Sequence, residues 1–202
     1  MMDTFLIQNI KARKKAGWIS FWVGVGMFFA KFTAYLITDS TAIFSDAAES
    51  VVHVVATSIA LYSIYLSSKP ADKTHLYGHG NVEYFSAGLE GILIIVAALV
   101  IFYTSIKAII IGIVPEKLDI GTTIIAAAGI VNLILGFYLV RMGKKTNSLT
   151  LIADGKHVLT DSYTSIGVVF GLILVLLTGY VILDPLIAII IAANILYTGL
   201  KL

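Results

Sequence analysis

Two stretches of the sequence carry acidic and imidazole side chains at one shared spacing, with polar residues at offsets of 0, 3 and 7. They are Asp46, Glu49 and His53 in the first stretch and Asp154, His157 and Asp161 in the second. In an α-helix these offsets lie on one face. Glu49, His53, His157 and Asp161 together offer two carboxylates and two imidazoles, a set that suits a tetrahedral first-row divalent ion, Zn²⁺ before others. Because imidazole also binds protons near neutral pH, such a site could exchange a metal ion for protons.

The elements that must position these residues are membrane-spanning helices. The 202 residues are 58% hydrophobic and 13% charged, against about 25% charged in an average soluble domain. With a mean hydropathy of +0.95, this composition excludes a soluble globular domain, a disordered chain and a nucleic-acid binder. Six long apolar runs cover residues 17–37, 42–66, 82–113, 120–142, 149–178 and 181–200. They are too long for the strands of a membrane barrel, so we predict an all-α membrane protein, a bundle of six transmembrane helices.

The basic residues of the loops predict the orientation of the bundle. With the N-terminus inside, the cytoplasmic side holds ten basic residues and the outer side holds only Lys117. The ten are Lys11, Arg13, Lys14, Lys15, Lys69, Lys73, Arg141, Lys144, Lys145 and Lys201. This excess predicts that both termini are cytoplasmic, with residues 1–16 as a basic N-terminal segment and residues 17–202 as the transport domain. We expect a multi-pass protein of a prokaryotic cell (inner) membrane.

The two polar stripes are predicted to meet near the middle of the membrane. From the rise of a helix, Glu49 and His53 lie roughly 10 to 17 Å into the second span, and His157 and Asp161 roughly 12 to 18 Å into the fifth. The second and fifth spans run antiparallel, so face-to-face packing brings the four side chains together. Lys31 is expected to extend from its span to the membrane interface, as long side chains often do.

Other polar residues have less specific interpretations. Asp46 and Asp154, one turn from the predicted ligands, are expected to line the ion path or orient the ligands. Glu90, a lone acid of the third run, is either a pathway residue or a packing partner. The Asp184-Pro185 pair predicts the N-cap and first residue of the last helix.

The loop after the second run holds another group of metal-binding residue types. Asp72, His75 and His79 are closely spaced within residues 67–80. They predict either a second cation site or a guide for ions toward the cytoplasmic entrance, and a solvated loop is the alternative.

Several of these motifs together resemble the cation diffusion facilitator family of divalent metal transporters, over essentially all six spans. The matching segments are Pro70-Ala71-Asp72-x-x-His75-x-x-Gly78-His79-Gly80 followed by Glu83, Ala153-Asp154-x-x-His157-x-x-x-Asp161, Ser45-Asp46-Ala47, and Asp184-Pro185 with Ile195-Leu196-Tyr197. The resemblance implies a central metal site of two residues, four apart, on each of the second and fifth helices. It also implies alternating access with proton antiport, usually in a homodimer.

The sequence departs from the family pattern at three places. Members usually have His or Asp and then Asp in the second span, where this chain has Glu49 and His53. A basic residue is common where this chain has Asn81. The family commonly continues into a cytoplasmic domain, whereas this sequence stops at Leu202, so we expect no C-terminal cytoplasmic domain in it. The changed ligand placement leaves Fe²⁺, Mn²⁺, Co²⁺ and Cd²⁺ open beside Zn²⁺.

The resulting prediction is a divalent metal efflux transporter that exchanges zinc for protons by alternating access. Its expected partners are the metal ion, protons, the lipid bilayer and a second copy of the chain, with no cofactor and no nucleic acid. A passive cation channel and an intramembrane metalloenzyme are the alternatives. The sequence contains no His-Glu-x-x-His motif, and four protein ligands leave no open position for a catalytic water, so we expect no enzymatic activity.

Overall fold

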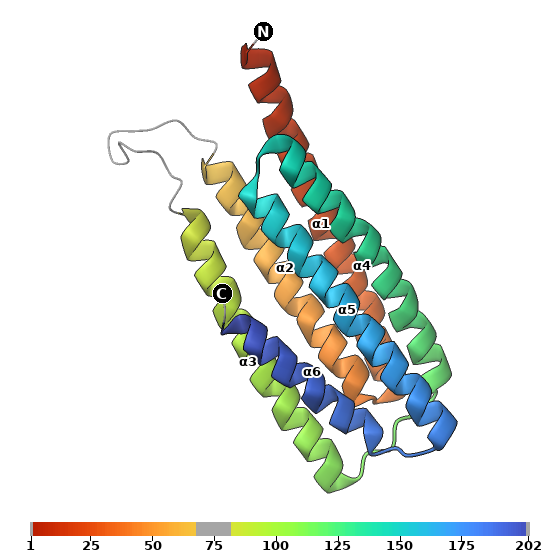
Figure 1. Cartoon of the computed structure of the whole chain (residues 1–202). Helices are drawn as coiled ribbons and strands as arrows, with labels where there is room; N and C mark the ends of the chain where they lie inside the picture. The colour runs from red at the N-terminus through yellow and green to blue at the C-terminus, as the bar shows by residue number, and fades with distance from the viewer. Residues whose placement is uncertain (1, 68–81, 201–202) are drawn as a thin grey trace.

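The structure is a bundle of long α-helices (Figure 1). It is a computed structural model that describes residues 2–67 and 82–200; residues 1, 68–81 and 201–202 lie outside this description. Within the described ranges the regular elements are α1 (Met2–Thr38), α2 (Thr41–Ser67), α3 (Val82–Ile111), α4 (Leu118–Thr146), α5 (Leu149–Thr178) and α6 (Leu183–Gly199). The predicted all-helical fold is confirmed, and each helix lies close to one of the six apolar runs.

Five of these helices, α1 to α5, are long and apolar enough to cross a membrane, and α6 is a shorter apolar helix of 17 residues. Large apolar side chains such as Trp22, Ile110 and Phe170 are exposed on the outside of the bundle, where lipid replaces water as the solvent. The protein is therefore an integral multi-pass membrane protein. The cytoplasmic placement of its termini stays a prediction.

The N-terminal basic segment is part of α1. The helix begins at Met2 and continues without a break to Thr38, which at 1.5 Å per residue is about 55 Å and exceeds a hydrocarbon core of about 30 Å. Arg13 donates a hydrogen bond from Nε to the carbonyl oxygen of Thr146 at 3.1 Å. This basic side chain thus binds the last turn of α4, where unpaired carbonyl groups favour a cation.

Helix α2 lies at the centre of the bundle and contacts α1, α3, α5 and α6. It runs antiparallel to α5, as Figure 1 shows by the opposite order of their residues along the bundle. The largest helix contact is between α4 and α5, which approach closely at glycines: a Cβ atom on Gly155 would lie 2.7 Å from the backbone nitrogen of Val140. Helix α4 packs on both α1 and α5, and α1 packs on α2. These contacts hold α5 against α2.

The role predicted for Asp184 as the N-cap of its own helix is wrong. Helix α6 begins at Leu183, so Asp184 already lies in its first turn. The Asp184 carboxylate instead caps α2: it accepts hydrogen bonds from the backbone N–H of Thr41 at 2.7 Å, the Thr41 hydroxyl at 2.8 Å and the Ser40 hydroxyl at 2.5 Å. The start of α2 presents unpaired N–H groups and a partial positive charge beside α6, and this attracts the carboxylate.

Candidate metal centre

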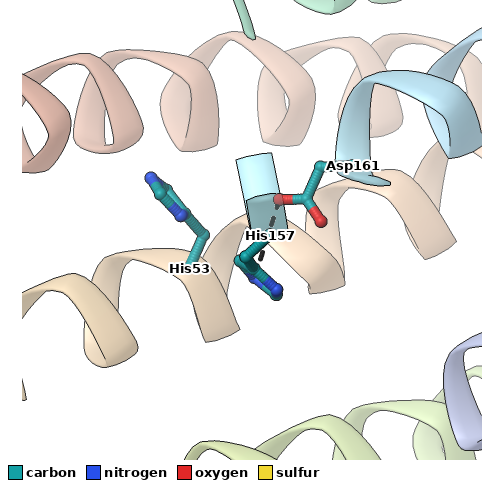
Figure 2. Close-up of side chains that lie close together, drawn as sticks. All are labelled: His53, His157 and Asp161. Atoms are coloured by element: carbon teal, nitrogen blue, oxygen red, sulfur yellow. Dashed lines mark ion pairs between the residues drawn. The ribbon is translucent and has the colours of Figure 1, made fainter. Parts of the chain in front are cut away.

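Three of the four predicted ligands lie together between α2 and α5. His53 comes from α2, and His157 and Asp161 come from α5; one potential ligand atom of each residue lies within 4.8 Å of the other two. The two imidazole rings stack with centroids 5.9 Å apart and planes at 17°, and His157 Nε2 lies 3.8 Å from Asp161 Oδ2. Figure 2 shows His157 between His53 and Asp161. Two imidazoles and one carboxylate therefore lie close together, with His53 and Asp161 buried and His157 half-buried.

The fourth predicted ligand, Glu49, lies beside this group and outside it. Its Oε2 accepts a hydrogen bond from the Thr164 hydroxyl at 2.8 Å, and both side chains are buried. Glu49 lines the same cavity as His157 and Asp161. Thr164 had no role in the sequence analysis, although it follows Asp161 by three residues and so lies on the same helix face. The metal-ligand role of all four residues stays a prediction.

A small cavity lies beside Glu49, His157 and Asp161, and His53 is not among the residues that line it. Its walls come from α2, α3, α5 and α6, and it has about 20 Å³ of room for water. That is enough for about one water molecule or one metal ion. The polar residues that line it are Glu49, His157, Thr160, Asp161, Thr164, Asn194 and Thr198. The space has the size and the oxygen and nitrogen donors that a single bound cation requires.

Asp154 lies beside the metal centre, as expected for a residue that orients a ligand. Its Oδ1 is 3.9 Å from His53 Nδ1 and accepts a hydrogen bond from the Thr57 hydroxyl at 3.3 Å. A carboxylate next to one ring nitrogen of a histidine favours a proton there and leaves the other nitrogen to a metal. Thr57 in turn holds the carboxylate in place. This positioning role stays a prediction.

Asp46 pairs with Lys31, so the predicted placement of Lys31 at the membrane interface is wrong, whereas the pathway or orienting role of Asp46 stays a prediction. Both side chains are 0% exposed, with Lys31 Nζ 3.0 Å from Asp46 Oδ1. Because α1 packs directly on α2, the ammonium group finds an opposite charge inside the bundle and does not have to reach the interface. The spacing of residues along one helix contains no signal for this pair, which joins two helices.

The remaining predicted residues are not placed by the structure. Asp72, His75 and His79 lie outside the described residues. Glu90 belongs to α3, but its side chain is among those not described. The second cation site in the loop and the pathway role of Glu90 stay predictions.

Gly24 of α1, which no sequence motif indicates, provides the room for His53. A Cβ atom on Gly24 would lie 2.6 Å from His53 Cδ2 and 2.9 Å from Nε2.

Gly24→Ala is therefore expected to displace the His53 ring and weaken Zn²⁺ binding about tenfold, since displaced supporting groups commonly cost 10- to 100-fold in metal affinity. Calorimetric titration of the purified protein in detergent measures this. Gly26→Ala is the matched control, because a Cβ atom there meets nothing within 4 Å; equal effects of the two changes would contradict the contact with His53.

Comparison with known proteins assigns the family. Residues 17–202 match the cation efflux transmembrane domain. An uncharacterised transporter of Synechocystis is 42% identical over 175 residues, which are 85% of this chain and 56% of the relative. The magnetosome protein MamB of Magnetospirillum gryphiswaldense is 30% identical, over 94% of this chain and 64% of the relative. The cadmium, cobalt and zinc/H(+)-K(+) antiporter of Bacillus subtilis is 28% identical, over 95% and 61%.

The chain thus spans about 56 to 64% of the length of these curated bacterial relatives. The match covers all six helices from residue 17 onward, and the family is one of transporters and not of enzymes. The resemblance that the sequence motifs indicated is confirmed: the chain belongs to the cation efflux family, also called the cation diffusion facilitator family.

Proposed function

We propose that the protein carries a divalent metal ion, Zn²⁺ foremost, out of the cytoplasm in exchange for protons. The observation that carries this proposal is the group of His53, His157 and Asp161 between two antiparallel helices, with one ligand atom of each within 4.8 Å of the others. His53 and Asp161 are buried and His157 is half-buried. Ionisable side chains this deep in a bilayer are costly unless they are paired or bind an ion. The similarity to the cadmium, cobalt and zinc/H(+)-K(+) antiporter of Bacillus subtilis supports the same substrate class.

The donor types support Zn²⁺ over harder cations. Imidazole nitrogens bind Zn²⁺ and its transition-metal neighbours well, whereas Mg²⁺ and Ca²⁺ prefer oxygen ligands. Asp161 and, across the cavity, Glu49 supply the negative charge that balances a divalent ion. Cd²⁺, Co²⁺, Fe²⁺ and Mn²⁺ are the alternative cargoes, and selection among them depends on the geometry that the bound site adopts.

Charge balance supports proton exchange. A divalent ion that binds here neutralises the carboxylates and requires neutral imidazoles, so it competes with protons for the same atoms. Once the metal has left, protons on these groups restore charge balance before the empty carrier returns. Release on the outer side and reloading on the cytoplasmic side then form one alternating-access cycle, in a homodimer as the family resemblance implies.

Transport in proteoliposomes tests the proposal. Zn²⁺ flux, followed with a zinc-sensitive dye in the lumen, is expected to increase when a pH gradient is imposed and to disappear in the double variant His157→Ala, Asp161→Ala. Asp119→Asn, which changes an exposed acid in the first turn of α4, is the control and keeps the wild-type flux. Undiminished flux in the double variant would exclude this site, and flux that ignores the pH gradient would indicate a passive channel.

A further inference from the structure

A second buried charged group lies next to the metal centre, where α1, α2 and α5 meet. Lys31 Nζ donates to Asp46 Oδ1 at 3.0 Å and to Ser165 Oγ at 3.3 Å. The Ser165 hydroxyl donates to the same Asp46 oxygen at 2.7 Å. Lys31 and Asp46 are 0% exposed and Ser165 is 1% exposed. One residue from each of three helices therefore forms a closed group of charged and polar side chains.

This group lies one helical turn from the metal centre on both helices that build it. Asp46 precedes Glu49 by three residues on α2, and Ser165 follows Asp161 by four residues on α5; such neighbours lie about 5 to 6 Å apart on a helix surface. The next hydrogen bond along the contact between α2 and α5 is the one from Thr164 to Glu49. Asp46 and Glu49 thus lie on adjoining turns of α2, and Asp161 lies one turn from Ser165 on the facing helix α5.

Asp46 has unused capacity to bind a cation. Among the residues that the structure describes, its Oδ2 is buried and has no hydrogen-bond partner. Without Lys31, the negative charge of Asp46 would have no opposite charge beside it in the low-dielectric interior. Its carboxylate and the Ser165 hydroxyl would then be oxygen ligands available to a cation. Oxygen donors of this kind attract a second divalent cation, and Glu49 lies one turn away to complete the set.

We propose that Lys31 is the fixed counter-cation of Asp46 and restricts the transport site to one metal ion per chain. The ammonium group occupies the position that a second cation would otherwise take, and it cannot dissociate. Lys31 neutralises Asp46, so the metal centre is the one place where these carboxylates can bind a mobile ion. A carrier with one metal site can release all of its bound metal in each transport cycle. This inference rests on the proposed metal transport and deepens it.

The stoichiometry of Zn²⁺ binding tests the inference. To remove the cation site predicted in the loop, all proteins in this test carry His75→Ala and His79→Ala. With Lys31 present, this protein purified in detergent is expected to bind one Zn²⁺ per chain in calorimetric titration. Lys31→Met, which keeps the length of the side chain and removes the charge, is expected to bind two. Lys31→Met combined with Asp46→Asn removes both charges and is expected to bind one again. The control Lys107→Met changes an exposed lysine of α3 and leaves the stoichiometry unchanged.

Asp46→Asn alone provides a second readout that does not depend on the folding of Lys31→Met. It leaves the Lys31 charge unpaired one turn from the metal centre, and this repulsion is expected to weaken Zn²⁺ binding about tenfold or more. The double variant is expected to restore the affinity. One Zn²⁺ per chain in every variant that folds, or an unchanged affinity of Asp46→Asn, overturns the inference. Absence of Zn²⁺ binding by the wild type would contradict the proposed function instead.

Discussion

Asp161→Asn is expected to weaken Zn²⁺ binding on the order of 100-fold or more, because even a residue that only supports a metal ligand is worth 10- to 100-fold. Asp161 supplies the carboxylate of the three-residue group with His53 and His157. Asparagine keeps the shape of the side chain and removes the charge that balances the ion. Calorimetric titration of purified protein measures the affinity, with the exposed Asp119→Asn as control.

Glu49→Gln is expected to have a smaller effect, about tenfold. Glu49 lies outside the three-residue group, and its Oε2 is already bonded to Thr164 at 2.8 Å. The ratio of the two losses therefore reports how the site binds its ion. Equal losses for Glu49→Gln and Asp161→Asn would show that Glu49 leaves Thr164 to become a fourth ligand. An unchanged affinity of Asp161→Asn would contradict the assigned metal centre.

Asp184→Ala is expected to lower the free energy of unfolding by about 3 kcal/mol, because hydrogen bonds to a charged group contribute about 1.5 to 3 kcal/mol each and the loss of one N-cap costs up to about 2 kcal/mol. The buried carboxylate accepts bonds from Ser40, from the N–H and hydroxyl of Thr41, and from the N–H of Ala42 at 3.3 Å. Its removal leaves the donors at the start of α2 without an acceptor.

The midpoint of thermal unfolding, followed by the helical circular dichroism of the protein in detergent, measures this loss. Asp184→Asn keeps one acceptor oxygen and is expected to be intermediate. Asp119→Ala removes an exposed first-turn acid from α4 and is expected to leave the midpoint unchanged. If Asp184→Ala unfolds at the wild-type temperature, the contact between α6 and α2 does not stabilise the bundle as the hydrogen bonds indicate.

Much of the metal centre was predictable because it depends on distances along single helices. The offsets of 0, 3 and 7 place Asp46, Glu49 and His53 on one face of α2. The offset of four places His157 and Asp161 on one face of α5. Six apolar runs that alternate in direction make these two helices antiparallel, and the rise per residue brings their polar positions to the same depth. Burial of two polar stripes in a bilayer favours their contact, which the structure shows for His53, His157 and Asp161.

The contacts between different helices could not be predicted from spacing along the sequence. Lys31 is buried because α1 lies against Asp46 of α2, and Asp184 caps α2 because α6 begins beside it. Likewise, the space for the His53 ring depends on Gly24 of α1. Periodicity constrains which side chains share a face of one helix, whereas the pairing of faces between helices is set by the packing of the whole bundle. Amino-acid order thus specified the two halves of the candidate metal centre. The three-dimensional arrangement specified the contacts between helices that surround it, those of Lys31 with Asp46, of Gly24 with His53 and of Asp184 with the start of α2.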